Sequence, residues 1–228
     1  MSSPTLTFTP AMFHAAHVAR IKTVTRRLAQ VSRQNHIDQL AEAIAKDAEM
    51  QFWTSHLHLA AHQPGEVKPM VTSWAVHSDW DECKPSDIEP DVIEGEIASQ
   101  YSGGIWFDDG SEKPAWAGKS RPARFLPKSL YHLAPQVRIE SAQPEPLQNI
   151  TPDDARAEGI RCISKDGSTL KYGLTDRDGL PGEDDIGWAW SRWRGSAVDA
   201  YFHLWDTIHP DHRAFSNPIV WRYQFTVL

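Results

Sequence analysis

The residue pair with the clearest chemical potential lies near the N-terminus, where Lys22 and Thr25 are three positions apart. The residues before Lys22 have a helical pattern and those after Thr25 an extended one. The pair is therefore predicted at a helix-to-strand junction, where both side chains can face one pocket. A lysine can take the proton of a threonine nucleophile when its amine is neutral. Burial and the nearby Arg20, Arg26 and Arg27 are expected to lower the pKa of Lys22, which suits cleavage of an amide or ester.

A carboxylate for the same reaction lies far along the chain, at Glu158. Thr151 followed by Pro152 is a typical helix start, and Asp154 has the spacing of a capping box. Gly159 is the residue type that ends helices in the left-handed conformation. Glu158 therefore falls in the last helical turn, where the helix dipole disfavours a carboxylate and favours a proton donor.

Each of these residues also has a structural interpretation. Without Glu158 beside them, Lys22 and Thr25 form an ordinary basic turn with solvated charge. Arg26 and Arg27 suit phosphate binding and pairing with surface acids equally well, because exposed arginines often contribute little. His56, His58 and His62 do not have the companion Cys or Glu of a zinc site, so no metal is expected. The tryptophans around Arg192 are expected to pack a loop onto the fold rather than to stack on bases.

Composition limits the class of protein. The 228 residues allow one large domain over 1–228, and 40% hydrophobic residues indicate a globular chain. No stretch of about 18 apolar residues is present, so no membrane span is expected. The N-terminus has no signal-peptide pattern, and two cysteines fit a reduced, cytoplasmic setting, although one disulfide is not ruled out. The net charge of −7 argues against a protein that tracks long nucleic acid.

The elements around these residues are expected to be short. A helix is predicted over 10–19, a second over 36–50, and further helices that begin at Thr151 and Ser196. Strands are predicted at 5–9, 23–28, 71–76, 93–97, 104–107, 137–142 and 220–227, and a hairpin or long loop over 164–185. Strands and helices do not alternate as in βαβ units, so the sequence predicts an α+β fold with a small mixed barrel and peripheral helices.

Two segments resemble motifs of the ASCH family, whose members are PUA-like β-barrels. Residues 19–27, ARIKTVTRR, are similar to the family's GRKTxTxR segment, and 149–160, NITPDDARAEGI, to its LT-x-x-x-A-x-x-E-G helix. The segments 84–88, 121–127 and 217–221 are similar to ASCH proteins encoded by phages and prophages. The resemblance covers most of a chain that is about twice the usual length of the family, which implies insertions at about 29–70 (helical) and 164–195 (loop).

The resemblance also implies residue roles. Small bacterial ASCH enzymes hydrolyse N4-acetylcytidine, and by the motif match Lys22 would be the base, Thr25 the nucleophile and Glu158 the proton donor. Arg20, Arg26, Arg27 and Arg124 are predicted to bind substrate, and no cofactor is implied. The sequence departs from the motif at Ala19, Ile21 and Arg26. These departures and the inserted segments leave the nature of the substrate open.

Two functions of different classes follow. The first is an amidohydrolase that removes an acyl group from N4-acylated cytidine or a related modified nucleoside. The second is a PUA-like module that binds a modified base or short, single-stranded RNA without chemistry. Turnover of N4-acylated cytidines distinguishes the two, and the first requires that Lys22, Thr25 and Glu158 converge on one pocket.

Overall fold

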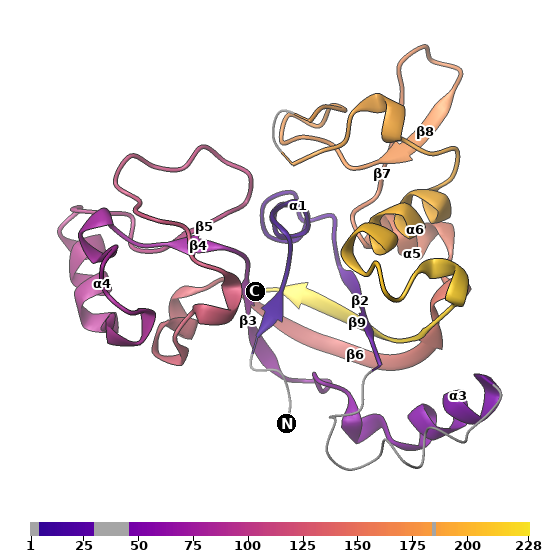
Figure 1. Ribbon diagram of the computed structural model, residues 1–228, viewed down its shortest axis with the longest axis horizontal. Helices are drawn as coiled ribbons and strands as arrows, with labels where there is room; N and C mark the ends of the chain where they lie inside the picture. The colour runs from indigo at the N-terminus through magenta and orange to yellow at the C-terminus, as the bar shows by residue number, and fades with distance from the viewer. Residues whose placement is uncertain (1–4, 30–45, 184–185) are drawn as a thin grey trace.

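The main sheet has five strands and mixes one parallel pair with three antiparallel pairs (Figure 1). The computed structural model describes residues 5–29, 46–183 and 186–228. In spatial order the strands are β1 (Leu6–Thr7), β3 (Val67–Val71), β6 (Gln136–Pro146), β9 (Ile219–Val227) and β2 (Val24–Leu28). Helices pack on this sheet, so the α+β class predicted from the sequence is confirmed.

The described strands form an open sheet rather than a closed barrel. Among the described strands, the edge strand β1 pairs with β3 and the edge strand β2 pairs with β9, and no ladder joins β1 to β2. A side chain spans the gap between these edges: Arg27 of β2 donates a hydrogen bond to the carbonyl of Thr7 in β1. Its guanidinium carbon also lies 5.5 Å from the centre of the Phe8 ring.

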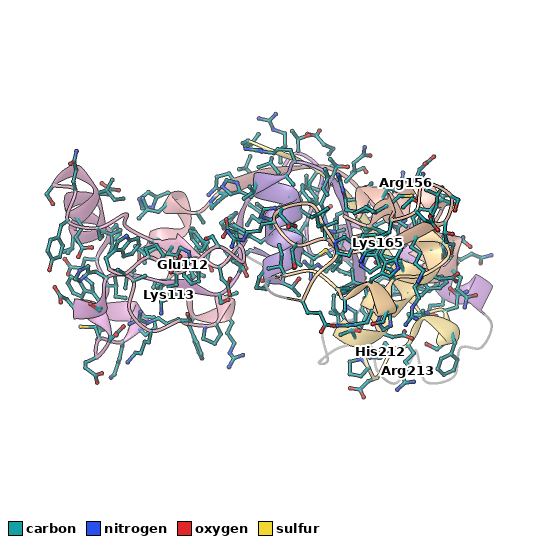
Figure 2. All side chains as sticks on the ribbon, turned by 90° about the horizontal axis from the view of Figure 1, so that it is seen from above. Glu112, Lys113, Arg156, Lys165, His212 and Arg213 are labelled. Atoms are coloured by element: carbon teal, nitrogen blue, oxygen red, sulfur yellow. The ribbon has the colours of Figure 1, made fainter. Side chains whose placement is uncertain are left out.

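Residues 72–135 leave the sheet and form what we call the insertion lobe. It contains β4 (Trp74–Ala75), β5 (Trp106–Phe107) and α4 (Pro90–Ala98). Its core is made of Trp74, Val76, Ile88, Ile93, Leu126, Leu130 and Ala134, and Val71 at the end of β3 packs with them. Figures 1 and 2 show the lobe, with Glu112 and Lys113, set apart from the sheet. Phe107 packs against both cores, and its ring stacks 5.9 Å from that of Phe13.

The lobe corrects several strand predictions. Residues 93–97 were predicted as a strand but lie in α4, which has Pro90 in its first turn. Ile93 and Ile97 are four apart, a spacing that fits one face of a helix, and Ile93 is buried while Ile97 is 45% exposed. The predicted strand 71–76 is divided, because β3 ends at Val71 and β4 begins at Trp74. Of 104–107, only the last two residues form a strand.

The segments predicted as insertions have mixed structure. Of the predicted helix 36–50, residues 36–45 lie outside the described ranges, and the rest begins α3 (Lys46–Ser55). The expected helical segment 29–70 is wrong at its end, where β3 begins at Val67 because Pro69 and its neighbours pair with β6. In 164–195 a hairpin of β7 (Arg161–Ser164) and β8 (Leu170–Gly173) precedes irregular chain.

Two helices lie side by side over one end of the sheet (Figure 1). The capping box predicted at Thr151 is present at the start of α5 (Pro152–Ala157). Ser196 caps α6 (Ala197–Ile208) and accepts a hydrogen bond from the Asp199 N–H at 3.1 Å. Within the described ranges, no helix combines the length and the apolar composition that crossing a membrane requires.

Candidate active site

Lys22 lies at a helix-to-strand junction, as predicted. The first helix, α1 (Pro10–Phe13), is capped by Thr9 and continues into a π-helical turn (His14–Val18). The chain then reverses through Arg20, which has a left-handed φ of 55°. The N–H groups of Ile21 and Lys22 both donate to the Ala15 carbonyl, at 2.9 and 3.0 Å, before β2 begins at Val24. These two hydrogen bonds to one carbonyl fix the position of the Lys22 backbone, and with it the point from which the Lys22 side chain extends.

The ammonium group of Lys22 is enclosed. The residue is 1% exposed, and its Nζ donates to the Val24 carbonyl at 2.7 Å and the Glu158 carbonyl at 3.2 Å. Its third hydrogen bond goes to Glu158 Oε2 at 2.5 Å. Burial lowers the pKa of Lys22, and Arg27 and Arg26 act in the same direction against the opposing effect of Glu158. The direction agrees with the sequence prediction, with burial as the largest cause.

Glu158 is the C-cap of α5 and is also buried, at 3% exposed. Its Oε1 accepts hydrogen bonds from Arg26 Nη1 at 3.2 Å and from the Tyr201 hydroxyl at 3.4 Å. Gly159 follows with φ at +107°, and a Cβ there would lie 3.3 Å from the Cβ of Ala15. The glycine therefore ends the helix and lets α5 pack closely against the π-helical turn before Lys22.

The three predicted catalytic residues, Lys22, Thr25 and Glu158, line one cavity of about 60 Å³. Thr25 is 4% exposed and reaches the cavity from β2. The remaining walls come from the chain before α1, from α1 itself, from β2 and from α6 with its C-cap: Thr7, Phe8, Thr9, Met12, Arg26, Arg27, Tyr201, Leu204, Trp205, Ile208 and His209. A space of this size holds a few water molecules or a short acyl group but not a nucleoside.

Arg26 was expected to bind substrate, but in the structure its guanidinium pairs with carboxylates of the protein itself. Its guanidinium reaches Glu145 through Nε at 2.7 Å, Asp154 through Nη2 at 3.2 Å and Glu158 through Nη1 at 3.2 Å. Asp154 also accepts a hydrogen bond from Arg222 Nη2 at 2.8 Å. A buried guanidinium must be paired, and here it forms ion pairs with three carboxylates, although its Nη2 makes no hydrogen bond to the described part of the chain. We call Lys22, Arg26, Glu145, Asp154 and Glu158 the buried ionic cluster.

Of the other three arginines predicted to bind substrate, one lines the cavity and two do not. Arg27 lines the cavity and is half-buried. Arg20 is exposed, donates to the Val227 carbonyl at 3.4 Å and does not line the cavity. Arg124 lies in the insertion lobe, outside the lining of this cavity. The sequence placed Arg124 near the site by resemblance alone, without a local pattern to fix its position.

Tyr201 is the polar residue that the sequence analysis did not assign to the site. It belongs to the apolar stripe of α6, is 4% exposed, and donates its hydroxyl to Glu158. Burial raises its pKa well above the ordinary tyrosine value, so the phenol stays a neutral donor. The available signal was a tyrosine among buried residues, since buried hydroxyl groups usually have a hydrogen-bond partner.

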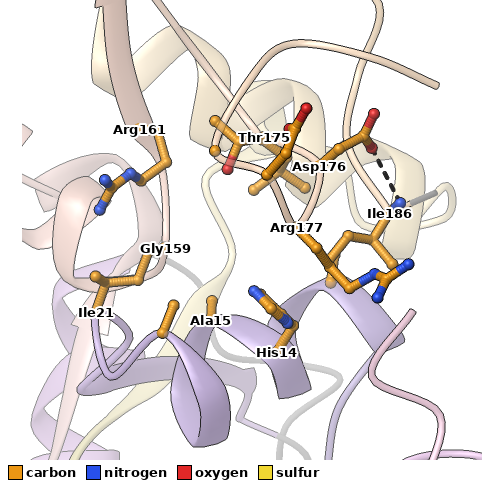
Figure 3. A pocket seen from close by; sticks show the side chains of 14 residues that line it. His14, Ala15, Ile21, Gly159, Arg161, Thr175, Asp176, Arg177 and Ile186 are labelled. Atoms are coloured by element: carbon orange, nitrogen blue, oxygen red, sulfur yellow. Dashed lines mark hydrogen bonds between the residues drawn. The ribbon is translucent and has the colours of Figure 1, made fainter. Parts of the chain in front are cut away.

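A second cavity of about 260 Å³ lies on another face of the first helix (Figure 3). Ala11, His14 and Ala15 line it, whereas Met12 lines the smaller cavity. Figure 3 shows Arg161 and Arg177 on opposite sides of it, on the strand after Gly159 and on the loop after β8. None of the three predicted catalytic residues lines this space.

The histidines, cysteines and tryptophans that the sequence offers as further candidates form no additional site in the described part of the chain. No group of three or more His, Cys, Asp or Glu that could hold a metal ion occurs in the described part of the chain. Cys83 and Cys162 are free thiols. Trp188 and Trp193 are buried in the main core, with the Trp193 indole donating to the Trp188 carbonyl at 2.9 Å.

The arrangement brings together the hydroxyl of Thr25, the lysine Lys22, whose pKa burial lowers, and the Glu158 carboxyl group, which shares a short hydrogen bond with that lysine. Such a set can transfer protons around an acyl carbon held in the cavity. Comparisons of this chain with protein-family models, with curated proteins and with solved structures find no match.

Proposed function

We propose that the chain is an amidohydrolase that removes a short acyl group from the exocyclic nitrogen of cytidine or a related modified nucleoside. The observation that carries the proposal is the 2.5 Å hydrogen bond between Lys22 Nζ and Glu158 Oε2 at a buried cavity that Thr25 also lines. A buried lysine–carboxylate pair exchanges a proton without a change in net charge, which makes a neutral amine accessible.

The first half-reaction begins when the ammonium proton of Lys22 passes to Glu158. The neutral amine then accepts the hydroxyl proton of Thr25, and Oγ1 forms a bond to the acyl carbon. The carbonyl electrons move onto oxygen, and Arg27 is the cation at the cavity that can stabilise this oxyanion. Collapse breaks the carbon–nitrogen bond, and protonated Glu158 donates its proton to the departing nitrogen.

The second half-reaction returns the enzyme to its starting state. A water molecule attacks the threonine ester, and the Glu158 carboxylate accepts its proton. The ester carbon–oxygen bond breaks as Thr25 takes a proton from the Lys22 ammonium. The products are a carboxylic acid and free Thr25. The proton of Glu158 then passes back to the Lys22 amine, which restores the ammonium–carboxylate pair. No cofactor enters these steps.

The substrate class is supported by the cavity and by the ASCH resemblance together. The cavity admits a short acyl group, so the nucleoside must remain at its mouth. The exposed or half-buried lining residues Thr9, Ile208 and His209 form that mouth. A PUA-like barrel also belongs to this proposal: Arg27 joins the two edges of the sheet, which is where closure would occur.

The test is turnover of N4-acetylcytidine by the purified chain, followed by the shift in cytosine absorbance. We expect wild-type turnover, and losses of about 100-fold or more in kcat for Thr25→Val and Glu158→Gln, which keep shape but remove the hydroxyl or the proton. Lys119→Met is the matched control for Lys22→Met, since Lys119 is an exposed lysine of the insertion lobe.

Absence of turnover across several N4-acylated cytidines and deoxycytidines would exclude the hydrolase. Retained binding of the same compounds would then favour the alternative, a module that holds a modified base without chemistry. One observation favours that alternative: all three Lys22 hydrogen bonds are already made within the protein. A module would bind its ligand equally well with Thr25→Val.

A further inference from the structure

The insertion lobe carries an open groove lined by Pro85, Ser86, Arg124, Phe125, Pro127 and Lys128. We propose that this groove binds single-stranded RNA, with a base on the Phe125 ring and backbone phosphates at Arg124 and Lys128. The proposal goes beyond the amidohydrolase and does not depend on it. None of the groove residues lines the cavity around Thr25.

The groove offers an aromatic face that the fold leaves in water. Phe125 is 49% exposed, and the Arg124 guanidinium carbon lies 4.7 Å from its ring centre. Bases stack on such rings whatever their sequence, and a guanidinium beside the ring adds a cation–π contribution. The arginine is therefore placed where it can contact a stacked base and its phosphate.

Buried neighbours hold this face in place. Phe125 ends a 3-10 turn (Ala123–Phe125) that follows Pro122, and its N–H donates to the Pro122 carbonyl at 3.0 Å. Leu126 and Leu130 enter the lobe core at 4% and 0% exposed. Since the residues that alternate with them are anchored, the ring and Lys128 are directed outward by the packing rather than left loose.

The opposite wall is built in the same way. Pro85 begins a short 3-10 turn (Pro85–Asp87), and Ile88 after it is buried in the same core at 1% exposed. The groove between these walls has a volume of about 460 Å³ and is open to solvent. Rigid walls on both sides reduce the ordering cost of binding an extended ligand.

The positive charge of the groove favours a ligand that carries phosphate groups. The lobe as a whole has more acidic than basic residues, yet the described residues that line the groove include two cations and no carboxylate. Phosphate groups would be repelled over most of the lobe and attracted here. A duplex presents its bases edge-on and paired, so the exposed ring favours an unpaired strand.

The experiment is fluorescence anisotropy of the full chain with a labelled single-stranded RNA of about ten nucleotides. We expect Phe125→Ala to weaken binding about tenfold, as expected for loss of one stacked base. Phe215→Ala is the matched control, because Phe215 is 80% exposed but lies outside the groove, and it should leave affinity unchanged.

Salt provides a second readout. Arg124→Ala and Lys128→Ala should each lower the slope of log affinity against log salt by about 0.7, the value for one phosphate on a single strand. Lys113→Ala, an exposed lysine of the same lobe, should not change the slope. Equal affinity for wild type and Phe125→Ala would overturn the proposal. So would tighter binding of a duplex, or of an acidic peptide, than of the single strand.

Discussion

Arg26 and Lys22, the two cations of the buried ionic cluster, differ in the groups that they contact. Arg26 contacts three carboxylates, Glu145, Asp154 and Glu158, whereas Lys22 reaches one carboxylate and two backbone carbonyls. Buried ion pairs rarely add net stability, but removal of one partner leaves an uncompensated charge. Arg26 therefore holds the cluster together, while Lys22 is the member whose charge can change at low cost.

This difference predicts a larger loss of stability for substitution of Arg26 than for substitution of Lys22. Arg26→Met should lower the free energy of unfolding by about 3–5 kcal/mol, because three carboxylates lose a shared cation. Lys22→Met should abolish turnover with a smaller loss of stability, since Glu158 keeps its bonds to Arg26 and Tyr201. Urea unfolding gives the free energy of unfolding of both variants, and kcat gives their turnover. Equal loss of stability would show that Lys22 is also mainly structural.

The lowered pKa of Lys22 predicts the pH dependence of both rate and stability. The proposed mechanism uses the one proton that Lys22 and Glu158 share, so the rate should fall as pH rises through the lowered pKa of Lys22, which lies below the ordinary lysine value of 10.5. Between the folded-state pKa and 10.5 the unfolded chain binds more protons at this site than the folded chain does. The Lys22 contribution to stability therefore increases with pH over that window.

A pH–rate profile of kcat/KM, with unfolding measured at each pH, tests both parts. The Lys22→Met variant should lose the pH-dependent stability term that belongs to this lysine. A rate limb at or above 10.5 in the wild type would contradict the assignment of Lys22 as base.

At the scale of elements, the site depends on the contact between the first helix and the end of α5. The π-helical turn places Ala15 under the N–H groups of Ile21 and Lys22. The Thr23 N–H then donates to the Ala157 carbonyl at 2.9 Å, which ties β2 to the last turn of α5. These bonds bring Glu158 to Lys22 across 136 positions of sequence.

Substitution of one glycine tests that contact. Gly159→Ala should destabilise the chain by more than the roughly 1–2 kcal/mol that a left-handed alanine costs, because its Cβ would lie 3.3 Å from that of Ala15. Gly167→Ala is the control, since Gly167 has φ at +74° and open space around its Cβ position. The Tm of both variants gives the comparison, and Gly159→Ala should also lose turnover. Equal losses of Tm would show that the contact with Ala15 is unimportant.

At the scale of the whole molecule, two cores share one chain. The lobe core and the main core meet at Phe107, whose ring stacks on Phe13. The lobe leaves after β3 and returns at β6, and these strands are antiparallel neighbours with Pro69 opposite Gln136. The ends of the excursion are therefore close enough to be joined by a turn.

Replacement of residues 73–134 by a short glycine-containing turn should leave a folded sheet. We expect one cooperative unfolding transition, a loss of about 0.5–1.5 kcal/mol from the missing ring contact, and retained turnover of N4-acetylcytidine. Binding of single-stranded RNA should be lost with the groove. Circular dichroism and thermal unfolding measure the first two outcomes, and an aggregated or unfolded product would show that the cores are interdependent.

The sequence by itself determined the features that rest on local hydrogen bonds and local conformation. Thr9, Thr151 and Ser196 cap helices where their spacing predicted, because a cap bond joins residues three apart. Gly159 adopts the left-handed conformation for a similarly local reason. The junction at Lys22 also follows from the change of pattern on either side of it.

Only the tertiary structure decided which distant groups meet. Arg26 and Arg124 look alike in sequence, yet one is buried among carboxylates and the other lies on the insertion lobe. Tyr201 and Glu158 are 43 positions apart, and their hydrogen bond depends on the packing of α6 against α5. Residues 93–97 form a helix although the alternation of their side chains predicted a strand. Long-range pairing and burial set these outcomes, and neither is encoded in the spacing of neighbouring residues.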